Sequence, residues 1–449
     1  MYTRLVSHLL FPLHERLKGH CSVALMRALE RSQWLPPESI AELQAENLRL
    51  FLGEIGRCVP YFRRRFQEVG LVPDAVSGPA DLTALPLMDK AAMRGAGDGL
   101  RADGARRLRR YNTGGSSGEP LIFYLGSRRI SHDVAAKRRA TRWWGVDIGD
   151  PEIVLWGSPI EHSKQDRMRE LRDRVMRTKL LPAFEMSIAN QDRFLKIIRR
   201  VRPRMLFGYP SAYALLASRA EACGLVMNDL PIRVVFVTSE QLYDHQREVI
   251  ERVFGAPVAN GYGARDAGFL AHTCPEGRLH LSAEHVVVEV VDPATKAPVA
   301  PGGSGELVVT HTATADYPFV RYRTGDIGRL ATTPCPCGRG LPVLAEVEGR
   351  TTDFVVAADG TVMHGLALIY ILRDMPEVAA FKIVQESLER TRVFVVPRNG
   401  WSSAADRAVK TGFQQRLGSA VAVQIEVVGE IPRDASGKYR YVVSHVAAR

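Results

Sequence analysis

Long apolar runs are missing from this sequence. No stretch reaches the roughly 18 consecutive apolar residues that a membrane-spanning helix needs, so we expect no transmembrane segment. The first 20 residues hold one short apolar patch, Leu9 to Leu13, and no small-residue cleavage site, which argues against a signal peptide. Cysteine is also scarce, with 6 residues in 449, too few for a disulfide scaffold. These absences predict a cytoplasmic protein.

Acidic residues are outnumbered. The 60 Lys and Arg residues exceed the 49 Asp and Glu residues, which gives a net charge of +11, and arginines gather in runs at 63–65 and 106–110. Such a surface attracts nucleic acid, an anionic membrane surface or a phosphorylated cofactor, or it is simply a solvated face. No nucleic-acid-binding motif accompanies the runs, so we expect no nucleic-acid partner.

The pattern of apolar residues changes along the chain. The first 70 residues carry apolar side chains at helical spacing. After residue 111, short strands at 152–157, 204–210, 233–240 and 258–263 are interspersed with helices at 211–224 and 244–255, which predicts a mainly parallel sheet. From about residue 280 the helices stop, and strands at 286–293, 305–312 and 328–333 suggest a compact antiparallel or β-barrel-like part.

The last 100 residues form a distinct pattern. Strands at 354–359, 381–387, 392–398 and 423–432 and helices at 363–375 and 404–418 follow a β-α-β-β-α-β order. The sequence therefore predicts an α/β protein with two domains. A large domain at 1–350 combines a helical N-terminus, layered mainly parallel sheets and the barrel-like part, and a small α+β domain occupies 351–449.

The segment 111–120, Tyr-Asn-Thr-Gly-Gly-Ser-Ser-Gly-Glu-Pro, consists largely of small and hydroxyl residues. Such a loop lets backbone N–H groups converge on phosphate oxygens. It lacks the Gly-Lys-Ser/Thr ending of a P-loop, so it is not that motif. Taken alone, it is equally well explained as a glycine-rich turn.

The segment 260–266, Asn-Gly-Tyr-Gly-Ala-Arg-Asp, follows a predicted strand, where α/β sheets present ligand-binding groups. Tyr262 can stack on a purine, and Asp266 can hold Mg²⁺. Taken alone, the segment is a turn with an aromatic plug.

Two further segments carry polar residues next to glycine. In 321–328, Arg-Tyr-Arg-Thr-Gly-Asp-Ile-Gly, Asp326 can accept both hydroxyls of a ribose, or it caps a turn. In 431–440, Ile-Pro-Arg-Asp-Ala-Ser-Gly-Lys-Tyr-Arg, Lys438 follows Gly437 and can reach phosphate or carboxylate oxygens, or it is simply solvated.

In this order and spacing, the four segments resemble the adenylate-forming superfamily of acyl-CoA synthetases, adenylation domains and luciferases. The sequence is most similar to the phenylacetate-CoA ligase branch, which includes capsule-biosynthesis CapK-like relatives. The branch is indicated by Leu-Pro-Leu-Met-Asp-Lys at 85–90, Gly-Gly-Ser-Gly-Glu-Leu at 302–307 and Cys-Pro-Cys-Gly-Arg at 335–339. The resemblance covers about residues 50 to 445.

The resemblance implies an acid–thiol ligase that joins a carboxylic acid to AMP and then transfers the acyl group. ATP, Mg²⁺ and CoA, or a carrier-protein phosphopantetheine in place of CoA, are the implied cofactors and acceptor. The small domain is expected to be mobile, so that Lys438 faces the substrate only during adenylation. The implied nucleotide-binding residues are Thr113, Gly114, Gly115, Ser116, Ser117, Gly118, Ser239, Glu240, Gly261, Tyr262, Gly263, Asp326 and Arg350.

The sequence departs from the family pattern at three places. The phosphate loop has Gly114 where Ser or Thr is usual and Glu119 where Lys is frequent. Asp266 stands where Glu is usual, and Thr352 occupies the position of the hinge acid. These departures keep a second hypothesis open, a catalytically weak nucleotide-binding homologue. A ligase that transfers the acyl group to an amine or a hydroxyl is the other alternative.

Two further sets of residues are candidates for ligand binding. Phe207, Tyr209 and Tyr213 suit a flat aromatic acid, or they are ordinary core. Three cysteines and one histidine have spacings that can bring them to a single tetrahedral Zn²⁺, the alternative being unmetallated thiols. These potential zinc ligands are Cys274, His280, Cys335 and Cys337, with His272 in reserve.

Overall fold

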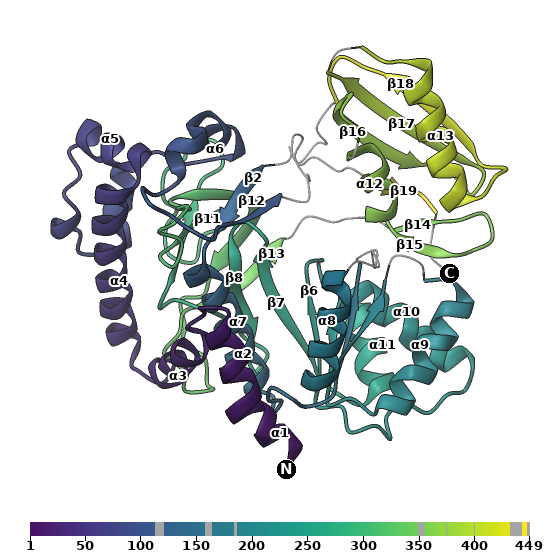
Figure 1. Cartoon of the computed structure of the whole chain (residues 1–449), viewed down its shortest axis with the longest axis horizontal. Helices are drawn as coiled ribbons and strands as arrows, with labels where there is room; N and C mark the ends of the chain where they lie inside the picture. Colours follow the sequence, from purple (N-terminus) through teal and green to yellow (C-terminus); the bar gives the residue numbers. More distant parts are fainter. Residues whose placement is uncertain are drawn as a thin grey trace. The chain divides into compact units, whose positions relative to one another are not determined.

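The computed structural model describes residues 1–112, 121–157, 164–183, 186–348, 354–373, 375–398, 400–431 and 442–446 (Figure 1). The chain divides into two compact units. The first comprises Met1–Thr113, Leu121–Asp150 and Ala259–Gly349, and the second comprises Gly114–Pro120, Pro151–Val258 and Arg350–Arg449. One boundary between segments of the two units falls between residues 349 and 350. The division of the chain into domains 1–350 and 351–449 stays a prediction.

Helices form the N-terminal part of the first unit, as the sequence predicts. On the longest helix, α4, residues Leu48, Phe51, Leu52 and Ile55 are spaced so that they share one face, and all four are buried. The helices are α1 (Tyr2–Leu5), α2 (Phe11–Leu17), α3 (Ser22–Ser32), α4 (Pro37–Cys58), α5 (Pro60–Val69), α6 (Lys90–Ala96) and α7 (Ser127–Arg142). A π-helical turn, η1 (Val6–Leu10), joins α1 to α2.

The strands of the first unit confirm the predicted change to antiparallel structure. A small hairpin pairs β1 (Arg109–Asn112) with β2 (Ile122–Leu125). The larger set lies in the linear order β10-β11-β12-β13-β9-β8-β7, so the predicted barrel-like part is an open sheet among the described residues. Its strands are β7 (Val258–Ala264), β8 (Gly268–Thr273), β9 (Leu279–Leu281), β10 (Val286–Val291), β11 (Gly305–His311), β12 (Tyr322–Leu330) and β13 (Val343–Glu348).

The segment 151–258 of the second unit has the predicted parallel sheet. Strand β3 pairs in parallel with β4 and β5, and β5 pairs in parallel with β6. All five residues of β6 are buried, which explains its continuous apolar sequence. The elements are β3 (Glu152–Trp156), α8 (Lys164–Met176), β4 (Thr178–Pro182), α9 (Ile188–Val201), β5 (Met205–Gly208), α10 (Pro210–Ala222), β6 (Val234–Thr238) and α11 (Asp244–Phe254).

The C-terminal segment has its own four-stranded sheet in the order β18-β17-β16-β19. The predicted first strand does not join it, because β14 pairs with β15 in a separate hairpin. The fourth position is taken by β19, which the sequence analysis missed. The elements are β14 (Phe354–Val356), β15 (Val362–His364), α12 (Leu366–Arg373), β16 (Val378–Gln385), β17 (Arg390–Pro397), α13 (Ser403–Leu417), β18 (Ala422–Val427) and β19 (Val442–Ser444).

One buried side chain links the hairpin to this sheet. The Gln385 amide on β16 donates to the backbone carbonyl of Val356 at 2.6 Å, and its oxygen accepts the N–H of Val356 at 2.9 Å. Both polar ends of a fully buried amide are therefore satisfied, which fixes β14 beside β16.

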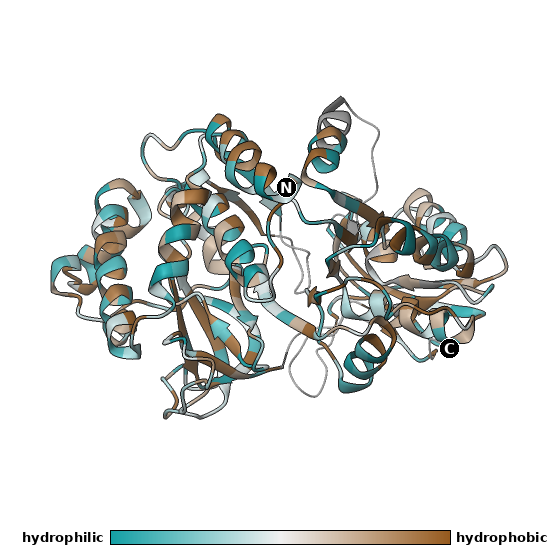
Figure 2. Cartoon of the chain, turned by 90° about the horizontal axis from the view of Figure 1, so that it is seen from below, coloured by the Kyte–Doolittle hydropathy of each residue, from teal (hydrophilic) through white to brown (hydrophobic). Residues whose placement is uncertain are grey.

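The strands and the helices differ in hydropathy. The strands are mostly apolar, whereas the helices alternate between polar and apolar positions (Figure 2). Among the described residues, no helix combines the length and the apolar character that crossing a membrane requires.

Candidate adenylate-forming site

Several predicted site residues lie outside the described part of the chain. These are the phosphate-loop residues Thr113, Gly114, Gly115, Ser116, Ser117 and Gly118, together with Arg350 and Lys438. The residue before the loop is described. Asn112 ends β1, and its carbonyl oxygen accepts a hydrogen bond from Arg265 Nη1 at 3.4 Å. The start of the predicted phosphate loop and the 260–266 segment therefore lie side by side.

Tyr262 and Asp326 meet although their strands are not neighbours in the antiparallel sheet. Tyr262 is on β7 and Asp326 on β12, 64 residues apart, and the Tyr262 hydroxyl donates to Asp326 Oδ2 at 3.0 Å. Gly325, just before Asp326, has a φ of 77°, a left-handed conformation that favours glycine. The ring predicted to stack on a purine and the carboxylate predicted to bind a ribose thus form one hydrogen-bonded pair.

The backbone beside Tyr262 leaves little space for side chains. A Cβ atom on Gly263 would lie 2.2 Å from the carbonyl oxygen of Gly268 on β8. Glycine is therefore required at 263 for β7 and β8 to approach at this point. Gly261 is on the same strand and pairs with His272 of β8.

Asp266 is held by a tyrosine that the sequence analysis did not single out. The Tyr322 hydroxyl donates to Asp266 Oδ2 at 2.6 Å, and Oδ1 accepts the N–H of Ala267 at 3.1 Å. The backbone oxygen of Asp266 accepts from buried Arg129 at 3.2 Å. Asp266 is only 8% exposed, so these bonds orient a carboxylate that is largely removed from solvent. A single hard carboxylate of this kind suits Mg²⁺, which keeps water and substrate phosphate as its other ligands.

Ser239 and Glu240 follow strand β6 in the second unit. Ser239 has a φ of 73°, a strained conformation for a residue with a side chain. The Ser211 hydroxyl at the start of α10 donates to Glu240 Oε2. The end of β6 is therefore fixed to the first turn of a neighbouring helix, which gives the predicted adenine-binding segment a defined position within its unit.

Aromatic rings gather at the ends of β3 and β5 and against β6. Trp156 stacks on Tyr209 with ring centroids 4.6 Å apart and on Phe207 at 6.1 Å, and Phe207 in turn stacks on Phe236 at 5.8 Å. Trp156 is partly buried. The sequence analysis did not single out Trp156, because this residue lies at the end of an apolar strand, where packing in the core explains a tryptophan equally well.

Tyr213 has a different place from Phe207 and Tyr209. It is fully buried, and its hydroxyl lies 3.2 Å from the backbone oxygens of both Ile153 and Phe207. Burial raises the pKa of Tyr213 well above its usual range, so the hydroxyl stays protonated and can donate. These contacts favour a supporting role behind the strand ends over the predicted place in the pocket wall.

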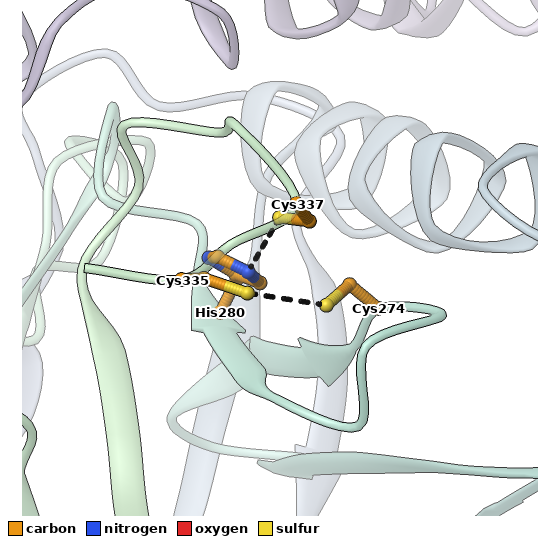
Figure 3. Close-up of side chains that lie close together, drawn as sticks. All are labelled: Cys274, His280, Cys335 and Cys337. Carbon is orange, nitrogen blue, oxygen red and sulfur yellow. Dashed lines mark hydrogen bonds between the residues drawn. The ribbon is translucent and has the colours of Figure 1, made fainter.

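The three cysteines and the histidine predicted to bind zinc converge (Figure 3). Their potential ligand atoms all lie within 4.8 Å of one another. Cys274 Sγ and Cys335 Sγ are 3.7 Å apart, and Cys337 Sγ is 3.3 Å from His280 Nε2. A tetrahedral Zn²⁺ with Zn–S bonds of about 2.3 Å needs sulfur atoms about 3.8 Å apart, so this arrangement fits the ion.

The surroundings of this cluster suit a metal ligand set. The second ring nitrogen of His280, Nδ1, lies 3.0 Å from the backbone oxygen of Leu341, which orients Nε2 toward the cysteines. Burial lowers the pKa of His280 to about 4, so the imidazole is neutral at pH 7 and its Nε2 can bind a metal. Burial raises the pKa of Cys335 to about 12 and also raises that of Cys274. A bound metal would therefore have to displace protons from these two thiols.

The cluster also lies against the N-terminal helices. Arg339 is sandwiched between two tryptophan rings, with its guanidinium carbon 4.6 Å from the Trp34 centroid and 4.4 Å from the Trp143 centroid. Although burial opposes ionisation of the neighbouring thiol, hydrogen bonds from Arg339 lower the pKa of Cys337. A Cβ atom on Gly340 would lie 2.0 Å from the carbonyl oxygen of Leu35, so the Cys-Pro-Cys-Gly-Arg segment packs closely on the α3–α4 connection.

The described residues contain a second group of potential metal ligands, formed by His132, Asp133 and His311. Here the carboxylate of Asp133 is paired with Arg129 at 3.1 Å. Burial opposes ionisation of Asp133, but Arg129 outweighs it and lowers the pKa. A guanidinium already neutralises this carboxylate, so the cysteine cluster is the better candidate for a metal site.

Comparison with known proteins finds matches in both halves of the chain. A family model described as "AMP-binding enzyme" matches residues 177–316, and one described as "CapK C-terminal domain" matches residues 355–445. Protein CapK of Staphylococcus aureus is 23% identical over 416 residues, which cover 90% of this chain and 89% of that protein. Phenylacetate-coenzyme A ligase of Thermus thermophilus is 24% identical over 362 residues, 77% of each chain.

A solved structure shows the same fold. The chain aligns with 2-hydroxyisobutyryl-CoA ligase in its thioesterification state with a TM-score of 0.65 and 20% identity, over 92% of each chain. The family matches and the relatives support the adenylate-forming superfamily for this chain. Within it, the C-terminal match and the two relatives support the branch that contains CapK and the phenylacetate-CoA ligases.

Proposed function

We propose that this chain is an AMP-forming acid–thiol ligase, which activates a carboxylic acid with ATP and transfers the acyl group to CoA or to a carrier-protein phosphopantetheine. The observation that carries the proposal is the 3.0 Å hydrogen bond between Tyr262 and Asp326. This bond joins a purine-stacking ring to a ribose-binding carboxylate in a member of the adenylate-forming superfamily. The clustered thiols fit the reducing cytoplasm, where we place the reaction.

The reaction proceeds in two displacements. A carboxylate oxygen of the acid attacks the α-phosphorus of ATP, the bond to the β-phosphate breaks, and pyrophosphate leaves. The thiolate sulfur of the acceptor then attacks the acyl carbon, and AMP leaves with the bridging oxygen. Negative charge grows on phosphorus in the first step, so catalysis requires positive groups placed in advance.

Each site residue has a role in this scheme. Asp326 accepts the ribose hydroxyls and is positioned by Tyr262, whose ring covers the adenine. Ser239 and Glu240 keep their predicted role in nucleotide binding. The loop 113–118 supplies backbone N–H groups to the phosphates. A bound Mg²⁺ neutralises phosphate charge, and Asp266 is the residue that would hold it. Lys438 supplies the cation between the carboxylate and the α-phosphate.

The acid that fits this site is aromatic. Trp156 is only partly buried, and it stacks on Tyr209 and Phe207, which are buried behind it. The flat ring of Trp156 favours a ligand that can stack on it at about 4.5–7 Å. The aliphatic alternative would gain only contact area from the same ring.

Substitutions at Tyr209 and Tyr213 should distinguish a residue that contacts the acid from a residue that only supports the pocket. Tyr209→Ala should raise the KM for an aryl acid roughly tenfold, because stacking and contact area are lost together, while the KM for ATP stays within about twofold. Tyr213→Phe should lower the free energy of unfolding by about 1 kcal/mol, since its hydroxyl no longer donates, and should leave acid selectivity unchanged. Steady-state kinetics and urea unfolding measure the two effects. A change of acid selectivity in Tyr213→Phe would return this residue to the pocket wall.

We also propose that the cysteine cluster, Cys274, His280, Cys335 and Cys337, binds one structural Zn²⁺. With four protein ligands, a tetrahedral site has no open position for substrate, so its role is to stabilise the fold. The segment that carries Cys335 and Cys337 packs on the α3–α4 connection through Arg339. The ion would therefore hold the N-terminal helices against the sheet.

Metal analysis should find about one zinc per chain in the purified protein. Cys337→Ser should lower the melting temperature and leave the KM for ATP within about twofold, because the cluster makes no contact with Tyr262 or Asp326 among the described bonds. Cys223→Ser, which alters an exposed cysteine elsewhere, is the matched control and should retain the zinc. Protein that is free of zinc and equally stable would remove the ion from the account.

The proposed function itself is tested by exchange of labelled pyrophosphate into ATP. A panel of aryl, hydroxy and fatty acids should contain at least one acid that drives exchange above the acid-free rate. Product analysis by mass spectrometry with CoA should then detect the corresponding thioester. Binding of ATP without exchange on any acid would support the alternative, a homologue that binds the nucleotide and has lost the chemistry.

A further inference from the structure

The helical segment at the start of the chain has an apolar face exposed to solvent. Helix α1, the π turn η1 and helix α2 are contiguous from Tyr2 to Leu17. Leu9, Leu13 and Leu17 on this segment are 56%, 53% and 80% exposed, and their spacing of four residues places them in a stripe. The stripe continues to Leu5 and to Tyr2, which are also exposed. Five large apolar side chains in one line exceed the isolated surface leucines that soluble proteins normally carry.

The opposite face of this segment is held firmly on the first unit. Val6 is fully buried and Phe11 nearly so. The Ser7 hydroxyl donates to Asp147 at 2.9 Å, and the Thr3 hydroxyl donates to Asp150 at 3.0 Å. The segment is therefore already docked, and the leucine stripe faces outward because its other face is already occupied.

The charged side chains that the segment itself exposes have one sign. Arg4, Arg16 and Lys18 are exposed beside it. The one acidic residue among the first 20, Glu15, is buried and bonded to Ser22 and to His20, so it presents no negative charge to the surface. The segment thus combines exposed leucines and a tyrosine with basic side chains and lacks an exposed acid.

We propose that the face formed by Tyr2, Leu5, Leu9, Leu13 and Leu17 is a docking site for an anionic lipid surface. Such a helix lies in the plane of the interface, with its apolar side chains among the acyl chains and its basic side chains at the phosphate headgroups. The segment is too short and too polar on its inner face to cross a membrane. Docking would hold this ligase at the membrane surface, independently of which acid it activates.

Charge favours a lipid surface over a second copy of the chain. Two copies that met through this stripe would bring Arg4, Arg16 and Lys18 of each against the same residues of the other, and like charges repel. An anionic surface attracts these residues, and the net charge of +11 adds to that attraction. The attraction is worth roughly fivefold in binding for each basic residue close to the surface.

Co-sedimentation of the full chain with vesicles tests the proposal. The parent should bind vesicles that mix phosphatidylcholine with phosphatidylglycerol, bind those of phosphatidylcholine alone much more weakly, and be released by high salt. The double variant Leu9→Gln/Leu13→Gln should bind at least about tenfold more weakly, because two exposed leucines no longer enter the interface. The control Leu50→Gln/Val72→Gln alters two other exposed apolar residues and should bind like the parent.

The remaining outcomes decide against the proposal. Equal binding by the parent and by Leu9→Gln/Leu13→Gln, or no binding to anionic vesicles, would overturn it. If sedimentation velocity without lipid shows that the parent forms a dimer and that the double variant does not, the stripe is a contact between two copies of the chain instead. Circular dichroism should show unchanged helix content in each variant. Pyrophosphate exchange in solution should be unaffected, because the stripe has no part in the proposed nucleotide binding.

Discussion

Replacing Lys438 by alanine should abolish acid-dependent pyrophosphate exchange. The lysine is proposed to neutralise charge that develops between the carboxylate and the α-phosphate, and the loss of one such preorganised contact costs on the order of a hundredfold or more in rate. The same variant should convert a chemically synthesised acyl adenylate to the thioester at close to the parent rate. The reason is that the domain carrying Lys438 is expected to rotate it away before acyl transfer.

The matched control for this variant is Lys410→Ala. Lys410 lies on α13 in the same C-terminal segment, where it pairs with Asp406 at 2.9 Å, and its loss should leave both half-reactions intact. Equal loss of both half-reactions in folded Lys438→Ala would contradict the two-position mechanism. Thr352, which occupies the position where the family usually has the hinge acid, would then be the first residue to test.

Asp326→Ala should raise the KM for ATP by roughly a hundredfold. The carboxylate is expected to accept two ribose hydroxyls, and losing both charge-assisted hydrogen bonds costs on the order of 3 kcal/mol. Acid selectivity should be nearly unchanged because the carboxylate contacts only the nucleotide. Steady-state kinetics with ATP varied at saturating acid measures the effect.

Tyr262→Phe provides a graded companion to Asp326→Ala. It removes only the hydroxyl that donates to Asp326 and keeps the ring, so the KM for ATP should rise by several-fold, as expected for one lost hydrogen bond. Asp98→Ala removes an exposed carboxylate from the same unit and should have no effect. An Asp326→Ala enzyme with the ATP dependence of the parent would refute ribose binding by this residue.

Local sequence patterns predicted the elements of this fold well. The β/α alternation from 152 to 258 and the antiparallel strands that follow are both confirmed, because β-branched runs and helical spacing are local properties. Which strands pair is a long-range property. The C-terminal sheet shows this, since the predicted first strand forms a separate hairpin and β19, only three residues long, takes its place in the sheet.

The same limit applies to the site. Motif order singled out Tyr262, Asp266 and Asp326 as candidates from the sequence. Short spacings predicted only that Cys274 can share a ligand with His280 and Cys335 with Cys337, and the structure brings the two pairs together. Tyr322 was missed although it lies within a quoted motif, because nothing local shows that its hydroxyl reaches an aspartate 56 residues earlier. Tyr213 was assigned to a pocket for the opposite reason, since an aromatic residue beside a strand end has the same sequence pattern whether it faces ligand or core.

The central claim is that the acid is activated as an acyl adenylate, and oxygen transfer tests it most directly. The acid that drives the greatest pyrophosphate exchange is labelled with ¹⁸O in both carboxylate oxygens and is incubated with ATP, Mg²⁺ and CoA. If carboxylate oxygen attacks the α-phosphorus, the AMP released must carry one ¹⁸O atom in its phosphate, which mass spectrometry detects. Formation of unlabelled AMP, or of ADP with labelled inorganic phosphate, would contradict the claim.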